Sequence, residues 1–250
     1  MLIKGMEWAE PKFNSSQIKQ AGKSFIAPRS DADHDRAIEI INNWRACHQY
    51  PLNIIAKGLR VRAERVNQKR EVVQRIKQIS TIKNKLSLLT TKLNQMQDIG
   101  GCRAIMPSLD DVLDLRALQK RSDIKHTLVR EKNYINNPRD TGYRGIHLIY
   151  SYKSDKMKTW NGLLIEMQIR TRIQHIWATA VEAVDTFLDN ALKSGKGDAE
   201  WHKFFVLMSD AMSRYEVLPP LLTHPPRKIS DHEELRFLAI KLDVIRVRTL

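Results

Sequence analysis

Two carboxylate residues occupy positions in the sequence where a chemical site is expected. Asp98 directly precedes one apolar run, and Glu166 lies inside another. Side chains alternate between the two faces of a strand, so Glu166 would share a face with Gln168 and Arg170. Such a polar face is costly to bury unless it serves a site, although a solvent-facing edge strand would explain it as well. Asp98 and Glu166 are therefore candidate functional acids.

Lysine and arginine residues are concentrated ahead of these acids. The segment 57–92 is rich in both and contains only Glu64 and Glu71 as acids. Phosphoryl transfer needs this combination, because carboxylates hold Mg²⁺, cations neutralise the phosphates and a base accepts the proton of the incoming hydroxyl. The residues that can supply these parts are Asp98, Glu166, the basic segment 75–85, Arg103 and Arg144.

The sequence contains no glycine-rich phosphate loop. The pair Gly100-Gly101 fits neither the GxxxxGK spacing nor the GxGxxG spacing. Side chains rather than a glycine cradle would therefore hold a nucleotide. Cys102, inside the same apolar run, is typical of a small buried residue rather than of a nucleophile.

The overall charge indicates polyanionic partners. The 42 Lys and Arg residues outnumber the 28 acids, which gives a net charge of +14 at pH 7. Nucleotides, RNA, DNA and acidic proteins all fit such a charge, which does not choose among them. The basic residues of 57–70 fit either a solvated helix face or a surface that contacts RNA or a nucleotide.

Composition also limits the class of protein. No apolar run approaches the roughly 20 residues of a membrane span, and the N-terminus lacks the apolar stretch of a signal peptide. The two cysteines, Cys47 and Cys102, are too few for a disulfide framework and have no metal-ligand spacing. We expect a cytoplasmic protein with no membrane contact.

The elements that must position these residues can be predicted from periodicity. Helices are expected from about Asp35 and from Pro51, followed by a helical piece from Val72 and a basic loop or turn at 78–87. Strands are then interleaved with helices that begin near Ser108 and Thr171. The expected strands are 99–106, 124–130, 144–152 and 163–169. This succession predicts an α/β (α+β) fold with a mixed β-sheet of about five strands flanked by helices.

The two ends of the chain look different from this central part. Residues 1–34 are expected to be a polar lead-in. After a central domain at 35–190, residues 191–250 are expected to be a helical extension with a proline-rich linker at 218–227. The last helical pattern still runs at Leu250, which fits a fragment of a longer protein as well as a genuine terminal helix.

Four motifs, taken together and in order, resemble the synthetase domain of the RelA/SpoT alarmone synthetases over about residues 40–190. They are Arg75-Ile-Lys77 with Thr81 and Lys85, Asp98-Ile-Gly-Gly-Cys-Arg103, Lys132 to His147, and Glu166-Met-Gln168-Ile-Arg170. The resemblance implies a nucleotidyltransferase-like synthetase fold with extra N- and C-terminal helices. It also implies an ATP-dependent pyrophosphokinase with Mg²⁺ as cofactor.

The resemblance assigns roles to individual residues. Arg75 and Arg103 match the pair that sandwiches the ATP adenine, and a planar guanidinium suits such stacking. Asp98 and Glu166 match the catalytic, metal-holding carboxylates, and Glu166 would activate the 3′-hydroxyl of the acceptor. Tyr143 matches the tyrosine that stacks on guanine. The remaining matches are Lys77, Thr81 and Lys85 for the ATP phosphates, and Lys132, Arg144, His147, Gln168 and Arg170 for the acceptor side of the cleft.

The sequence departs from the family pattern on the acceptor side. The family usually has Asn-Gly-Tyr and Ser-Leu-His, where this chain has Thr141-Gly142-Tyr143 and Gly145-Ile146-His147. Pro138-Arg139 replaces Pro-Lys, and Thr81 stands at the serine of the basic loop. These departures leave the ATP half intact and put the identity of the acceptor in question.

Three functions fit the sequence. The first is alarmone synthesis, in which ATP and GDP or GTP give AMP and a (p)ppGpp-type nucleotide. The second, also known in this family, is a toxin of a toxin–antitoxin or phage-defence system that pyrophosphorylates the 3′ end of tRNA. The third is a catalytically inactive module that binds nucleotide or RNA, which the retained Asp98 and Glu166 argue against. The expected partners follow from these functions: ATP, GDP or GTP or a tRNA end, an antitoxin or regulatory protein, and further copies of the chain.

Overall fold

The computed structural model describes residues 7–187, 199–216 and 230–242. The chain forms two compact units. The first, here the sheet unit, contains residues 1–104, 117–131 and 147–168. The second, here the helical unit, contains residues 105–116, 132–146 and 169–250. Each unit is described by itself below.

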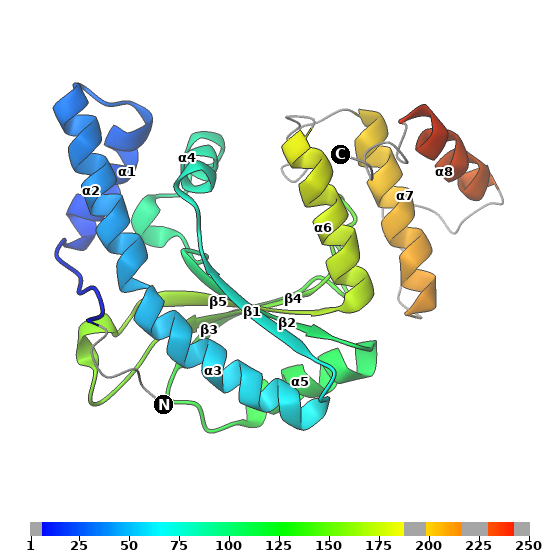
Figure 1. Cartoon of the computed structure of the whole chain (residues 1–250), viewed down its shortest axis with the longest axis horizontal. Helices are drawn as coiled ribbons and strands as arrows, with labels where there is room; N and C mark the ends of the chain where they lie inside the picture. Colours follow the sequence, from blue (N-terminus) through cyan, green and yellow to red (C-terminus); the bar gives the residue numbers. More distant parts are fainter. Residues whose placement is uncertain (1–6, 188–198, 217–229, 243–250) are drawn as a thin grey trace. The chain divides into compact units, whose positions relative to one another are not determined.

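A mixed sheet organises the central part of the chain (Figure 1). The five strands found among the described residues follow the order β1-β2-β5-β4-β3. They are β1 (Glu71–Ile76), β2 (Gly100–Met106), β3 (Thr127–Asn133), β4 (Ile146–Ser151) and β5 (Leu164–Thr171). The helices before and between them are α1 (Ser15–Ile26), α2 (Asp31–Cys47), α3 (Gln49–Val66), α4 (Ile79–Leu88), η1 (Leu93–Gln95), α5 (Leu109–Arg121) and η2 (Lys158–Trp160). The predicted fold class is confirmed.

Strand alternation gives the sheet one apolar and one polar face. On β5, Ile165 and Met167 are buried, whereas Glu166 and Gln168 between them are partly exposed. Helix α3 packs against β1 and crosses beneath the sheet in Figure 1, while α4 lies on the other side. The apolar side chains of β5 are therefore available to the core, and the acids are left for a site.

Two expectations about the basic segment were wrong. The helical piece expected from Val72 is the strand β1, and the loop expected at 78–87 is the helix α4. β1 ends the strand order, and its side chains are mostly exposed, so no clean alternation marks it in the sequence. α4 is fixed by Ile82, which is fully buried in a cluster with α1 and α2, against which Ile79 and Leu86 also pack.

The N-terminal segment is more structured than a polar lead-in. Asn14 caps α1 through a capping box with Gln17, in which each side chain bonds to the other residue's backbone N–H. One face of α1 buries Ile18, Ala21 and Phe25 against α2, α4 and η1. Residues 15–26 thus belong to the core of the sheet unit, although the boundaries of the expected domains stay a prediction.

Three helices pack together in the described C-terminal part of the helical unit. They are α6 (Arg172–Phe187), α7 (Ala199–Tyr215) and α8 (Ser230–Lys241), of which α7 packs against the other two. Trp177 and Trp201 are buried in their shared core, and the Trp177 Nε1–H donates to the Phe205 carbonyl at 2.9 Å. The proline-rich linker at 218–227 lies outside the described residues. No helix in the described ranges is both long and apolar enough to cross a membrane.

Helix α7 also supports the loop that carries Tyr143. Gly142 in this loop has φ +88°, a conformation that L side chains rarely adopt. A Cβ at this position would lie 2.9 Å from the Ser209 Cβ and 3.1 Å from Cζ2 of Trp177. The Ser209 hydroxyl donates to the Gly142 carbonyl at 2.5 Å. Glycine is therefore required both for the backbone conformation and for the close approach of α7.

Gly142→Ala should lower the free energy of unfolding more than Gly162→Ala does. Both positions have a left-handed backbone, but nothing lies within 4 Å of a Cβ built at Gly162. The backbone conformation should lower the free energy of unfolding of each variant by about 1–2 kcal/mol. Overpacking should lower that of Gly142→Ala by roughly a further 1–3 kcal/mol. Urea unfolding followed by Trp fluorescence measures both. An equal decrease in the free energy of unfolding for the two variants would contradict the packing of α7 on this loop.

Candidate active site

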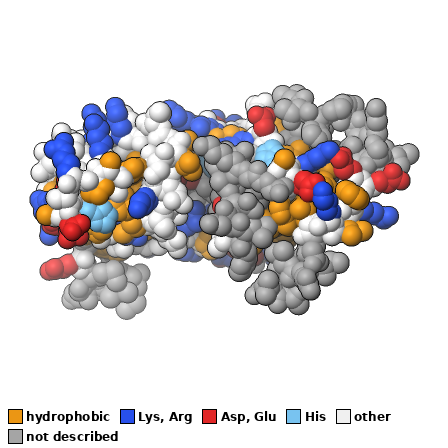
Figure 2. All heavy atoms as spheres, turned by 90° about the horizontal axis from the view of Figure 1, so that it is seen from above, with side chains coloured by type: hydrophobic (Ala, Val, Ile, Leu, Met, Phe, Trp, Pro, Cys, Tyr) orange, Lys and Arg blue, Asp and Glu red, His pale blue; other side chains and the backbone are white. Residues whose placement is uncertain are grey.

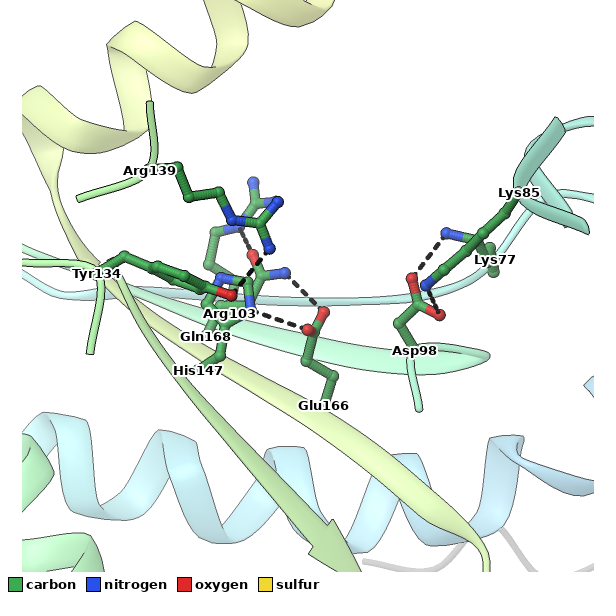
Figure 3. A network of polar contacts seen from close by, with 9 residues as sticks. All are labelled: Lys77, Lys85, Asp98, Arg103, Tyr134, Arg139, His147, Glu166 and Gln168. Atoms are coloured by element: carbon green, nitrogen blue, oxygen red, sulfur yellow. Dashed lines mark hydrogen bonds and ion pairs between the residues drawn. The ribbon is translucent and has the colours of Figure 1, made fainter. Parts of the chain in front are cut away.

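Asp98 lies between two lysine ammonium groups (Figure 3). The Lys77 Nζ is 2.8 Å from the Asp98 Oδ2, and the Lys85 Nζ is 2.9 Å from its Oδ1. The Lys77 side chain is only 9% exposed, against 29% for that of Lys85. A basic segment that was predicted to face phosphates therefore meets a carboxylate in this structure.

Backbone contacts hold the three residues in place. Lys77 follows β1 directly, and its N–H donates to the Ile99 carbonyl at 2.8 Å beside the start of β2. The Lys77 carbonyl accepts from the Arg45 Nε at 2.8 Å. Sequence reasoning missed Arg45, because a single basic residue in the last turn of α2 is an ordinary helix feature.

The lysines set the charge state of Asp98. Burial, the largest effect, would raise the pKa of Asp98, but the positive charges of Lys77 and Lys85 and their hydrogen bonds outweigh it. The pKa of Asp98 therefore lies below its ordinary value. Asp98 is ionised at neutral pH although it is largely withdrawn from water.

A chain of hydrogen bonds orients Glu166 on the polar face of the sheet. Figure 3 shows its members pointing toward one another from β2, β4 and β5. His147 Nδ1 donates to the Glu166 Oε1 at 2.9 Å, and the Gln168 Nε2 donates to its Oε2 at 2.7 Å. The Arg103 Nε donates to the Gln168 Oε1 at 3.1 Å. The structure thus brings Arg103, predicted to bind ATP, together with Glu166 and with His147 and Gln168, which were predicted on the acceptor side.

Glu166 is also ionised. Burial, the largest effect, would raise the pKa of Glu166, and the charge of Asp98 acts in the same direction. The hydrogen bond and charge of His147 and the hydrogen bond from Gln168 lower the pKa and outweigh these two effects. The net pKa lies below the ordinary value.

Cys102 precedes Arg103 on β2 and therefore lies on the other face of that strand. Burial raises the pKa of the Cys102 thiol to about 12, so it is no nucleophile.

The two acids suit a hard divalent cation. The negative charge of Asp98 acts to raise the pKa of Glu166, and a cation bound by both acids would remove this repulsion. Carboxylate oxygens are the ligands that Mg²⁺ prefers, and Mg²⁺ commonly takes one or two of them together with substrate phosphates. Across residues 7–187, 199–216 and 230–242, no group of three or more His, Cys, Asp or Glu side chains forms a cage for a metal. The donor set therefore fits an ion shared with a phosphate substrate.

Two further ATP-side candidates are exposed. Arg75 lies exposed on β1, two residues before Lys77, which directly follows the strand. Thr81 lies in α4, four residues before Lys85, which puts the two on one helix face. Their placement follows from the elements, and no contact between them and the Asp98 cluster is described.

The helical unit holds the other acceptor candidates. The Tyr143 ring has the Arg170 guanidinium carbon 4.8 Å and the Arg139 guanidinium carbon 5.6 Å from its centroid. Arg139 also lies 4.6 Å from the Tyr134 ring centroid and donates to the Tyr134 hydroxyl at 2.9 Å (Figure 3). Two tyrosines and two arginines thus form an alternating group, here the Tyr/Arg stack. Tyr134 and Arg139 were not assigned roles from sequence, although the departure at Arg139 from the family pattern marked the position.

Arg144 and Lys132 have different surroundings. Arg144 is 4% exposed, and its Nη1 donates to the Ile135 carbonyl at 3.2 Å. Burial lowers its pKa, while the charges of Asp210 and Glu216 raise it. In this structure Arg144 therefore ties the loop to its own surroundings, whereas Lys132 is exposed on β3.

The stability that Asp98 provides should depend on pH. Because its folded pKa lies below the unfolded value of about 3.9, ionised Asp98 stabilises the fold above that pH, and the stabilisation is lost as the pH falls through the folded pKa. The difference in unfolding free energy between wild type and Asp98→Asn should therefore narrow progressively as the pH falls below about 5. Urea titrations with EDTA present measure it, and a difference that stays constant with pH would contradict the ion pairs.

Comparisons with known proteins agree with this geometry. Residues 74–187 match the family model described as "Region found in RelA / SpoT proteins". The chain is 32% identical over 112 residues to the GTP pyrophosphokinase YjbM of Bacillus subtilis (strain 168), covering 43% of this chain and 52% of that protein. It is 30% identical over 123 residues to YwaC of the same strain, also named a GTP pyrophosphokinase, covering 46% and 58%. The chain thus spans just over half the length of these curated relatives.

Solved structures show the same fold. The small alarmone synthetase 1 of Bacillus subtilis bound to its product pppGpp has a TM-score of 0.59 and 21% identity, over 70% of this chain and 92% of that one. The small alarmone synthetase 2 of the same organism has a TM-score of 0.60 and 20% identity, over 70% and 94%. The match of motifs, of the family model and of the fold leads to one conclusion. Over residues 74–187 this chain is similar to the region found in RelA/SpoT proteins, and it shares the fold of the small alarmone synthetases.

Proposed function

We propose that the protein is an ATP-dependent pyrophosphokinase that transfers the diphosphate of ATP to the 3′-hydroxyl of GDP or GTP and releases AMP. The observation that carries this proposal is the polar face of the sheet, where Asp98 lies between two lysines and Glu166 is oriented by His147 and Gln168. The names of the two relatives, both GTP pyrophosphokinases, support the same reaction.

The donor half of the reaction uses the Asp98 cluster. Lys77 and Lys85 are the cations nearest to this carboxylate, and both would exchange it for the phosphates of ATP. Arg75 and Arg103 offer guanidinium planes on which adenine can stack. Small alarmone synthetase 1 of Bacillus subtilis has been solved bound to AMPCPP, an ATP analogue, which supports an adenine nucleotide as donor.

Glu166 would act as the base. Its carboxylate accepts the proton of the 3′-hydroxyl as that oxygen attacks the β-phosphorus of ATP, and the bond from the β-phosphorus to the bridging oxygen breaks to release AMP. A lowered pKa makes Glu166 a weak base, which suits phosphoryl transfer with a loose transition state, where little charge builds on the attacking oxygen. His147 and Gln168 hold both carboxylate oxygens in one orientation.

Mg²⁺ is proposed as the cofactor of this reaction. Asp98 and Glu166 would hold it, and it would supply neutralisation of the charge on the transferred phosphates. The chain's own contribution is to keep both carboxylates ionised, which the lysines and His147 achieve by lowering their pKa values.

The acceptor side has two proposed readings. Tyr143 can stack on the guanine of GDP or GTP, which is worth about 1–3 kcal/mol per base. The second candidate is the 3′ end of a tRNA, because the Tyr/Arg stack alternates aromatic and guanidinium planes as proteins that bind single-stranded nucleic acid do. The net charge of +14 supports it as well, although Figure 2 shows Lys and Arg side chains interspersed with acids and apolar side chains on the end of the sheet unit that carries α1 and α2.

Glu166→Gln should abolish transfer and preserve ATP binding. The amide cannot accept the hydroxyl proton, so AMP formation should fall by at least about a hundredfold, while the ATP dissociation constant stays within about threefold. Glu39→Gln, at an exposed position of α2, is the matched control and should retain full activity. Undiminished AMP formation by Glu166→Gln would contradict its role as base, and wild type that binds ATP without forming AMP would favour an inactive binding module.

The acceptor can be identified by competition. ATP labelled at the γ-phosphate is offered with GDP, GTP and deacylated tRNA together, and we expect label in the guanosine nucleotides. Arg139→Gln should raise the KM for the true acceptor severalfold and leave the KM for ATP unchanged, because Arg139 contacts Tyr143 in the Tyr/Arg stack. Label found only in tRNA would reject alarmone synthesis and favour the tRNA reaction.

A further inference from the structure

A cavity lies within the sheet unit, on the face of the sheet opposite to Glu166. Met167 lines it, and strand alternation turns Met167 away from its neighbours Glu166 and Gln168. The cavity has a volume of about 390 Å³, which is within the range of small-molecule sites. None of the residues assigned to the proposed reaction lines it. Its walls come from α3, from the loop before β3 and from the end of β4.

A half-buried arginine provides the charge of this cavity. The Arg62 Nε donates to the Oε1 of Gln119 at 2.8 Å, and Gln119 itself is 1% exposed. This contact fixes the guanidinium at the cavity wall. Burial lowers the pKa of Arg62, so its charge is held at a cost that an anionic ligand would offset.

A glycine in the middle of α3 makes room for this arginine. Gly58 lines the cavity well inside the helix, where glycine costs about 1 kcal/mol relative to alanine. A Cβ at this position would lie 2.8 Å from the Arg62 Nη2. The glycine therefore lets the guanidinium lie against the helix where an alanine would push it away.

Aromatic rings form the remaining wall. His126 stacks on Tyr152 with centroids 4.9 Å apart and planes at 29°. Tyr50 meets Tyr152 edge-on, with ring centroids 6.0 Å apart. Tyr150 also lines the cavity. Burial raises the pKa of Tyr150, and the positive charge of Arg62 partly offsets this effect. Such a wall favours a flat ligand, because aromatic faces stack on planar rings.

The rim carries further charges of both signs. Lys125, Lys153 and Asp123 line it, and all are exposed. Lys125 forms an ion pair with Asp155. The positive charges of Lys153 and the interior Arg62 then exceed the negative charge of Asp123, so the cavity has a net positive charge. The combination of an interior cation with aromatic walls defines the chemistry of the ligand.

We propose that this cavity binds a small aromatic anion, in which a planar ring packs against Tyr50, His126 and Tyr152 and a carboxylate or phosphate meets Arg62. Both an aromatic carboxylate and a nucleoside monophosphate have this chemistry. The site is separate from the proposed reaction and does not depend on it. A bound ligand would contact Met167, and so the strand that carries Glu166 on its other face.

The test places a reporter in the cavity itself. With ¹³C-methyl methionine in the full chain, the Met167 signal is assigned from Met167→Leu and followed during titration with 2-naphthoate and with GMP. Orthophosphate and cyclohexanecarboxylate serve as probes that lack the aromatic ring. We expect saturable shifts of the Met167 signal with one or both aromatic anions, and at least tenfold weaker binding of the two other probes.

Variants then identify the cation. Arg62→Gln should weaken binding about tenfold, as expected for loss of a charged hydrogen bond, whereas Arg60→Gln, the same change at an exposed position of α3, should not alter it. Gly58→Ala should weaken binding severalfold in a chain that folds at least as well. Three results would overturn the proposal: no shift of Met167 with either aromatic anion, equal binding by Arg62→Gln, or equal binding of orthophosphate. Loss of transfer activity in Glu166→Gln has no bearing on these outcomes.

Discussion

A carboxylate withdrawn from water between two ammonium groups is the interaction on which the proposed site depends. Burial works against the charge of Asp98, and only Lys77 and Lys85 keep it ionised. The same lysines would be needed by the phosphates of ATP, so ATP binding and the Asp98 ion pairs compete for them. A divalent cation held by Asp98 and Glu166 would replace the lysines as the partner of Asp98 and so leave both lysines available to the phosphates. Three elements of the sheet unit position these charges: Lys77 directly follows β1, Lys85 lies in α4 and Asp98 lies two residues before β2.

Sequence alone predicted the strands that carry Glu166, Arg103 and His147, because each has a regular apolar pattern that the sheet buries. It did not predict β1 or α4. β1 has mostly exposed side chains, so its apolar residues show no strict alternation, and α4 has only Ile82 fully buried among polar residues. Contacts that depend on tertiary structure, such as the Arg45 bond to the Lys77 carbonyl, have no local signal. The candidate residues were found from motifs, whereas the pairing of Asp98 with both lysines could come only from the folded chain.

The C-terminal helices of the helical unit support the loop that carries Tyr143, the proposed acceptor residue. Helix α7 packs against Gly142, directly beside Tyr143, and Trp177 joins the same contact. The Tyr/Arg stack that surrounds Tyr143 lies wholly within this unit. Helix α7, which looked from sequence like part of an extension, therefore supports the loop that carries Tyr143, the proposed acceptor residue.

The position of bond cleavage in ATP tests the central claim most directly. ATP carrying ¹⁸O in the bridge between the α- and β-phosphates is incubated with Mg²⁺, the protein and the acceptor, and the products are analysed by mass spectrometry. Attack on the β-phosphorus leaves the bridging ¹⁸O in free AMP, which is the result expected here. Release of ADP, or transfer of an adenylyl group with the ¹⁸O in the leaving pyrophosphate, would contradict diphosphate transfer at this site.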